Sequence, residues 1–313
     1  PQSRGVFPAG DPEPAAMTRT LLARILGALL LLFAVILPPA AAEDAQTVPP
    51  VRIGVLAYRG VESARAQWQA HAAYFEQRIP GTRFEIVPLG YGELAAAARD
   101  RTVQFVITNT GHYTEMELAG NATRIATRVM EGPGGLLDRM GGVVIARAER
   151  ADLRTYADLR NTMILYPDRS SLGGWQVHEG EAQAMGIDLT REAILLPETH
   201  NHEEVVYGVL ADRADAGFVR SDLIEQMAAE GKIRLDDLRV VNPRAEPGFP
   251  YRLSTRLYPE WPLAQVTGTP EALAREVLIA ALRLPPDSVA ARDAGIHGWV
   301  VAGSYKAVDD LFR

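Results

Sequence analysis

Cysteine is missing from all 313 residues of the sequence. Its absence excludes disulfide scaffolds, cysteine-ligated zinc, iron–sulfur clusters and thiol nucleophiles. Lysine is scarce as well: only Lys232 and Lys306 occur among 32 basic residues, and with 39 acidic residues the formal net charge is −7. We do not expect an acidic chain without a lysine-rich patch to bind nucleic acid.

The common catalytic and nucleotide-binding motifs are also missing. The sequence contains no Gly-x-Ser-x-Gly, Ser-x-x-Lys or His-Glu-x-x-His, and neither Gly-x-x-x-x-Gly-Lys nor Gly-x-Gly-x-x-Gly. Hydrophobic residues make up 47% of the chain and charged residues 23%, which is typical of a globular protein. We therefore expect a binding protein rather than an enzyme, and one without a cofactor.

The first 42 residues have the pattern of an export signal. Arg19 and Arg24 precede an uncharged apolar run at 25–37, and Pro38 to Ala42 supply small residues before Glu43. Thirteen apolar residues in a helix span about 20 Å, which is short of the roughly 30 Å of a membrane core. The pattern predicts export to the periplasm, with residues 1–42 cleaved off or kept as an N-terminal anchor.

After this segment, short β-rich runs alternate with helical stretches. We expect strands at 51–57, 83–88, 103–108, 124–129, 142–147, 162–166, 193–196, 214–219, 239–241 and 251–256. Helices are expected at 62–78, 91–99, 112–119, 175–185, 203–211, 222–230 and 271–282. This alternation predicts an α/β fold with two mainly parallel sheets.

Two segments have the composition of crossings between lobes, 141–151 and the Pro- and Gly-rich 240–255. They divide the chain into a first lobe at 51–145, a second lobe at 146–245 and a return to the first lobe at 246–313. Such a chain forms a bilobal clamp with hinge crossovers and a ligand cleft between the lobes. The alternative is one large doubly wound domain.

Ligands of α/β folds bind beyond the carboxyl ends of the strands, where loops lead into helix N-termini. Four loops at such positions carry Ser, Thr, Asn, Gly and Arg, whose N–H and O–H groups suit an oxyanion. The alternatives are that the hydroxyls only cap helices, that the arginines are solvated, and that the aromatic residues pack in the core. The candidate ligand-binding residues in these loops are Tyr58, Arg59, Thr108, Asn109, Gly111, His112, Tyr113, Ser170, Ser171, Gly173, Gly174, Trp175 and Arg220.

His200 and His202 form a His-x-His pair that could suggest a metal site. In an extended segment the two rings point to opposite faces, and no third ligand is evident. We therefore expect no metal, and we expect His202 to point into the cleft at the start of a helix.

These residues together resemble the phosphate/phosphite/phosphonate-binding group of periplasmic ABC transporter substrate-binding proteins. The resemblance covers about 51–313 and rests on segments 51–60, 104–113, 170–175 and 215–220. Within this group the chain is most similar to the periplasmic sensor regions of tetrathionate-sensor-like histidine kinases. These share Thr-Asn-x-Gly-His-Tyr and Gly-Gly-Trp segments, as well as the segments at 242–250 and 254–261.

The resemblance implies a type II-like binding fold that closes on a small anion. It implies that Tyr113, Ser170, Ser171 and His202 face the cleft and that Tyr58 closes its first-strand side. Phosphonate binders carry a Ser/Thr-rich run where this chain has Leu172 after the two serines, so the ligand stays open between a phosphonate-like and a sulfur oxyanion. The implied partner is an ABC permease that takes up the ligand; the alternative is a membrane-linked kinase module that senses it.

Overall fold

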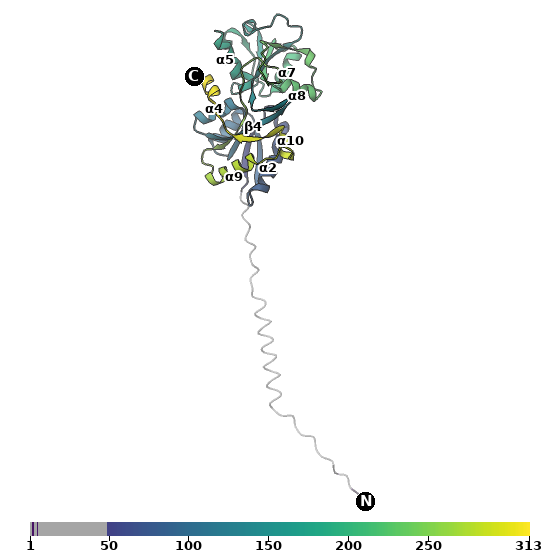
Figure 1. The fold of residues 1–313 in the computed structure, drawn as a ribbon, viewed down its shortest axis with the longest axis vertical. Helices are drawn as coiled ribbons and strands as arrows, with labels where there is room; N and C mark the ends of the chain where they lie inside the picture. Colours follow the sequence, from purple (N-terminus) through teal and green to yellow (C-terminus); the bar gives the residue numbers. More distant parts are fainter. Residues whose placement is uncertain (1, 3–4, 6–48) are drawn as a thin grey trace. The chain divides into compact units, whose positions relative to one another are not determined.

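The computed structural model describes residues 2, 5 and 49–313. The predicted export signal lies outside these residues. Within the described part of the chain, no helix is both long enough and apolar enough to cross a membrane. Residues 49–313 form one compact unit that contains two large β-sheets (Figure 1).

The first lobe is built on a seven-stranded sheet with the order β14-β4-β13-β3-β1-β2, and β5 also pairs with β4. Its strands are β1 (Val51–Leu56), β2 (Phe84–Leu89), β3 (Phe105–Ile107), β4 (Ala122–Gly132), β5 (Gly135–Leu137), β13 (Pro262–Val266) and β14 (Ile296–Val301). Its helices are α2 (Val61–Arg78), α3 (Tyr91–Arg99), α4 (Thr110–Leu118), α9 (Glu271–Leu282), α10 (Val289–Ala294) and α11 (Lys306–Asp309), followed by the 3₁₀ turn η4 (Asp310–Phe312).

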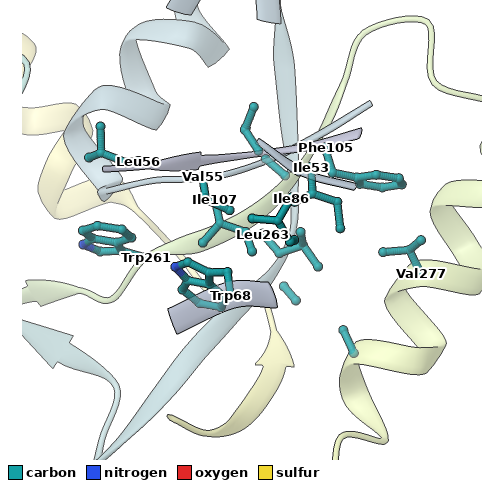
Figure 2. Packing of buried hydrophobic residues seen from close by; sticks show 14 of the residues in the cluster. Ile53, Val55, Leu56, Trp68, Ile86, Phe105, Ile107, Trp261, Leu263 and Val277 are labelled. Carbon is teal, nitrogen blue, oxygen red and sulfur yellow. The ribbon is translucent and has the colours of Figure 1, made fainter. Parts of the chain in front are cut away.

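The core of this lobe forms where the central strands are covered on both faces. Figure 2 shows β-strand residues such as Ile53, Val55 and Phe105 packed with Trp68 of α2 and Val277 of α9. Gly54 in β1 allows α3 to pack closely, because a Cβ atom there would lie 2.5 Å from Leu94 Cδ1. The tight packing fixes the carboxyl ends of β1, β2 and β3, from which three loops of the candidate site begin.

The second lobe is built on a five-stranded sheet with the order β11-β7-β10-β8-β9. Its strands are β7 (Gly142–Arg147), β8 (Met163–Leu165), β9 (Ile194–Leu195), β10 (Ala216–Arg220) and β11 (Leu238–Val241). The helical elements are η1 (Tyr156–Leu159), the π-helical turn η2 (Leu172–Gln176), α5 (Val177–Ala184), α6 (Leu189–Glu192), α7 (His202–Leu210), α8 (Leu223–Ala229) and η3 (Leu235–Asp237).

A short two-stranded ribbon connects the lobes. The outgoing strand β6 (Arg139–Met140) pairs antiparallel with the returning strand β12 (Tyr258–Pro259). The first crossing therefore lies before β7 and not mainly within 141–151, which β7 largely occupies. The return runs from β11 to β12 through residues 242–257 and overlaps the predicted crossing at 240–255, whose first two residues belong to β11.

The α/β class and the two-sheet organisation agree with the sequence, but both sheets are mixed rather than mainly parallel. In the first sheet only the pairs β1–β2 and β1–β3 are parallel, and in the second only β10–β8 and β8–β9. Some antiparallel pairs involve strands that enter a sheet after crossing from the other lobe, such as β7 and β13. Others, such as β4–β5, form within one lobe. The segment 251–256 is not a regular strand; Leu253 makes only an isolated bridge with Arg244.

Candidate functional site

Loops from both lobes meet between the sheets and define the candidate cleft. The Tyr58 carbonyl of the first lobe accepts the His202 N–H of the second lobe at 2.9 Å. Asn109 Oδ1 of the first lobe accepts the Leu172 N–H of the second lobe at 3.1 Å. These direct bonds between lobes show that the cleft is closed in this structure.

Asn109 caps helix α4 and lies where the two lobes meet. Its Oδ1 accepts the N–H of His112 at 3.0 Å as well as that of Leu172, which occupies both lone pairs of this oxygen. Its buried Nδ2 has no hydrogen-bond partner among residues 49–313. The amide group is therefore held by its oxygen and offers only donors.

Ser171 is oriented by a buried chain of hydrogen bonds. The Arg220 N–H points to His202 Nδ1 at 3.3 Å, and His202 Nε2 lies 3.1 Å from Ser171 Oγ. Burial, assisted by the nearby Arg220 charge, lowers the pKa of His202 to about 3, so its ring is neutral at neutral pH. Because Nδ1 accepts a hydrogen bond, the proton of the neutral ring is on Nε2, and the Nε2–H group donates a hydrogen bond to Ser171 Oγ.

Ser171 Oγ also accepts the Gly174 N–H at 3.1 Å, as expected for the residue that caps η2. The two acceptor positions of the hydroxyl are therefore used, and its own O–H is left to donate. Ser171 thus combines the predicted capping role with a donor that a ligand can use.

Tyr91 is a cleft residue that the sequence analysis missed. It begins helix α3, its hydroxyl lies beside Ser171, and its ring is 5.3 Å from that of His112. The buried hydroxyl has no hydrogen-bond partner within the described range 49–313, and burial raises its pKa. Its position after the strand at 84–89 was a usable signal, because Tyr91 follows the carboxyl end of a parallel strand, as the predicted loops do.

Gly111 sets how closely the lobes approach each other. A Cβ atom at this position would lie 1.7 Å from Gln176 Oε1 and 3.2 Å from Leu172 Cβ, both in the second lobe. Gln176 Nε2 in turn donates to Glu115 of α4 at 2.7 Å. The structure therefore gives a steric reason for glycine at position 111, and the predicted contact of Gly111 with the ligand stays a prediction.

Arg59 bridges the lobes through carboxylates. Its Nε donates to Glu203 of α7 at 2.6 Å, and its terminal nitrogens donate to Glu230 at 2.9 and 2.6 Å. Lys232 contacts the same two carboxylates at 3.0 Å. We expected this arginine to contact an anionic ligand, but the acidic side chains of the second lobe already occupy its donors.

Arg220 likewise forms ion pairs within a buried charge network at the hinge. It donates to Asp222 at 2.7 Å and to Glu260 at 2.9 Å, and Glu260 also accepts from Arg128 of β4 at 2.9 Å. Burial acts to raise the pKa of Glu260, but the two guanidinium groups lower it to about 2. Two positive and two negative side chains balance, so Arg220 brings no net charge to the cleft, contrary to the prediction, although its buried Nη1 has no hydrogen-bond partner within residues 49–313.

The other predicted residues fall into two groups. Ser170 lies beside Glu115 at the cleft edge, and Thr108 Oγ1 is 2.9 Å from His112 Nδ1 beneath the cleft. Tyr113 and Trp175 instead belong to the cores of the first and second lobes. The two side chains are 0% and 1% exposed, so the alternative that these aromatic residues pack in the core applies to both.

The glycines predicted with them serve packing. A Cβ atom on Gly173 would lie 2.7 Å from Arg220 Cβ, and one on Gly174 would lie 2.3 Å from Pro167 Cγ. The absence of side chains lets the π-helical turn η2 sit against β10. These glycines therefore help to place Ser171, and their predicted contact with the ligand stays a prediction.

A cavity of about 640 Å³ adjoins the cleft on the side of the hinge. Tyr58, Arg59 and Arg220 line it together with the hinge residue Met140 and with Tyr251 of the returning segment. Its lining comes from both lobes, so its volume depends on closure.

The two histidines of the His-x-His pair point to different places. His202 lies in the cleft, whereas the exposed His200 lies 3.1 Å from Asp168. Asp168, Glu198 and His200 offer ligand atoms within 4.8 Å of one another, so this group could hold a metal ion. The expectation of no metal stays a prediction.

Comparison with known proteins decides the family. A family model described as "ABC transporter, phosphonate, periplasmic substrate-binding protein" matches residues 53–304. The chain belongs to this family. The expected resemblance to periplasmic phosphonate-type binding proteins is thereby confirmed.

Solved structures of periplasmic phosphonate-binding proteins share the fold. PhnD1 from Prochlorococcus marinus (MIT 9301), in complex with methylphosphonate, has a TM-score of 0.68 at 13% identity over 83% of this chain and 96% of that chain. A binding protein component of an ABC phosphonate transporter from Pseudomonas aeruginosa has a TM-score of 0.70 at 12% identity over 84% and 85%. The predicted bilobal binding-protein fold is confirmed.

A curated relative of this phosphonate-type binding chain is a sensor. The tetrathionate sensor histidine kinase TtrS of Salmonella typhimurium (strain LT2) is 30% identical over 269 residues, which cover 83% of this chain. The match covers 43% of the sensor, so the chain spans less than half of that relative. This similarity confirms the predicted subgroup resemblance, and membership of a periplasmic binding family implies an extracytoplasmic location.

Proposed function

We propose that the chain binds a small oxyanion in the cleft between its lobes and closes around it without converting it chemically. One observation carries this proposal. Asn109 and Ser171 offer donors while their side-chain oxygens already accept two hydrogen bonds each, and the buried Tyr91 hydroxyl beside Ser171 has no partner within residues 49–313 and can donate as well. A phosphonate, phosphite, phosphate or sulfur oxyanion, whose oxygens accept hydrogen bonds, complements such a group of donors.

The charges around the cleft support a site that uses neutral donors. Arg59 and Arg220 are paired with carboxylates, and the rings of His112 and His202 are neutral because burial lowers their pKa values to about 4 and about 3. Helix α4 begins directly behind Asn109, so its positive dipole end faces the cleft. Helix N-termini and hydrogen bonds can stabilise an anion without a free cation.

A thermal-shift panel on the purified protein tests this function. The probes are phosphate, phosphite, methylphosphonate, sulfate, thiosulfate and tetrathionate, with glutamate and arginine as organic controls. A ligand at a hundred times its dissociation constant adds about 2.7 kcal/mol, which raises the melting temperature of a chain of this size by roughly 5–10 °C. A shift with one oxyanion supports the proposal; shifts only with the amino acids would refute it.

Two kinds of partner are candidates for recognising the closed, ligand-bound form of the chain. Membership of the ABC substrate-binding family favours delivery of the ligand to a permease. Similarity to a sensor kinase over most of this chain favours an extracytoplasmic sensing domain linked to a kinase module. The DNA downstream of the Arg313 codon separates the two: a stop codon supports the transport role, and a hydrophobic span of about 20 residues supports the sensor role.

A further inference from the structure

We propose that the C-terminal turn, residues 305–312, is a positioning element of the cleft: it docks on the Ser171 loop and couples its own docking to closure on the ligand. This inference rests on the oxyanion cleft proposed above. The turn comprises Tyr305, helix α11 and η4. Figure 1 shows it in yellow near α4, at the C-terminal end of the described chain.

Tyr305 anchors the turn to the first lobe. Its buried hydroxyl lies 2.7 Å from Thr127 Oγ1 of β4 and donates to the Glu260 carbonyl at 3.1 Å. Its ring packs edge-on against Tyr113, and the Arg124 guanidinium lies 4.8 Å from its centre. The start of the turn therefore moves with the first lobe.

The rest of the turn reaches the second lobe. Val308 is 0% exposed and forms one apolar cluster with Leu172 and Val177, which follow Ser171 in the chain. Leu311 packs against the same cluster. Leu311 also lies so close to α5 that a Cβ atom on Gly180 would be 2.7 Å from its Cδ2.

The contacted residues are those that complete the cleft. The Leu172 N–H bonds to Asn109 across the cleft, and the preceding Ser171 offers its O–H to the ligand. Pulling the second lobe away from the first would separate Val308 and Leu311 from Leu172 and Val177, exposing apolar surface. The turn therefore favours the closed arrangement, and whatever favours closure must also raise ligand affinity.

The test uses Leu311→Ala, with Leu311→Met as the conservative variant and Leu282→Ala as the control. Leu282 lies at the end of α9 on the first lobe and is 39% exposed, whereas Leu311 is half-buried, so Leu282→Ala reports the effect of truncating a leucine away from the lobe contact. Affinities for methylphosphonate and tetrathionate are measured by calorimetry on the full chain. We expect Leu311→Ala to weaken binding by roughly three- to tenfold, Leu311→Met to restore it, and Leu282→Ala to leave it unchanged.

Lobe distance provides a readout that a general loss of stability would not move. Because the chain has no cysteine, a pair of spin labels can be placed at L118C and M185C, which replace residues 73% and 50% exposed on different lobes. Without ligand, Leu311→Ala should shift the label distances toward a more open distribution than in the labelled parent and the Leu282→Ala control. If Leu311→Ala and Leu282→Ala show the same label-distance distributions and the same ligand affinities, the inference is overturned.

The two proposals fail in different ways. If no oxyanion binds the parent protein, the proposed ligand class is wrong, and the ligand-free distances still decide whether the turn controls closure. If the parent binds an oxyanion and Ser171→Ala weakens it while Leu311→Ala changes neither affinity nor distance, the cleft stands and the coupling is refuted.

Discussion

Replacing Tyr91 with phenylalanine separates ligand binding from stability. The Tyr91 hydroxyl is buried without a partner within residues 49–313, so its removal costs the ligand-free protein no hydrogen bond. A bond from this hydroxyl to a charged oxyanion is worth about 1.5–3 kcal/mol. We therefore expect Tyr91→Phe to weaken the binding of the oxyanion by roughly 10- to 150-fold. The free energy of unfolding without ligand should fall by less than about 0.5 kcal/mol, or rise.

Tyr156→Phe is the matched control, because Tyr156 is also buried but its hydroxyl lies 2.8 Å from His178 Nδ1 in the core of the second lobe. This variant should lose about 1 kcal/mol of stability and keep its affinity. Calorimetric titration with the oxyanion found in the panel gives the affinities, and urea unfolding gives the stabilities. Unchanged affinity in Tyr91→Phe, or an equal loss of affinity in Tyr156→Phe, would refute the assignment of Tyr91 to the cleft.

Three further outcomes follow from the charges. Arg59→Ala should weaken ligand binding several-fold because it removes the ion pairs between the lobes, and titrations from 0.05 to 0.5 M salt should show the difference from the parent shrinking. Glu260→Gln should destabilise the protein by about 3–5 kcal/mol in urea unfolding, since Arg128 and Arg220 lose the carboxylate between them; a loss below about 1 kcal/mol contradicts the network. Because the folded pKa of Glu260 is about 2, its contribution is present above its unfolded value and is lost as the pH falls toward 2. The free energy of unfolding should already decline below pH 6.5, because burial lowers the pKa values of four histidines in the folded protein. Between about pH 6.5 and 4 these side chains bind protons in the unfolded chain but stay neutral in the folded one: His71, His112, His178 and His202. A stability that stays constant between pH 7 and 5 would argue against their burial as neutral rings.

The sequence predicted most elements because their patterns are local. Buried strands such as β1 and β3 read as short apolar runs, and the ranges of α3 and α9 were predicted to the residue. The strands β13 and β14 were missed because Pro262 interrupts one pattern and glycine the other. Their places in the first sheet depend on pairing with β4, a contact between residues far apart in the chain.

The candidate site was predictable in position but not in detail. Strand ends pointed to Asn109, Ser171 and His202, and the structure brings these residues together where the lobes meet, since loops at the carboxyl ends of strands meet by the geometry of the fold. Their contact with a ligand stays a prediction. Sequence could not show that Arg59 and Arg220 would be neutralised, because Glu203, Glu230 and Glu260 arrive from elements far along the chain, and the neighbouring Asp222 alone did not indicate that it pairs with Arg220. It also could not tell which donors would be left without partners once the lobes closed.

Gly111 has a genetic consequence. Every missense change of a single base in a glycine codon adds a side chain, and the first atom of any side chain here would collide with Gln176. Gln176 would have to turn away from Glu115, and the nearby Leu172 leaves little room for the lobes to meet. Codon 111 is therefore a place where ordinary mutation should yield a protein that is made and folded yet held open. In a cell that depends on the ligand, such alleles would behave as losses of uptake or of signal without loss of the protein.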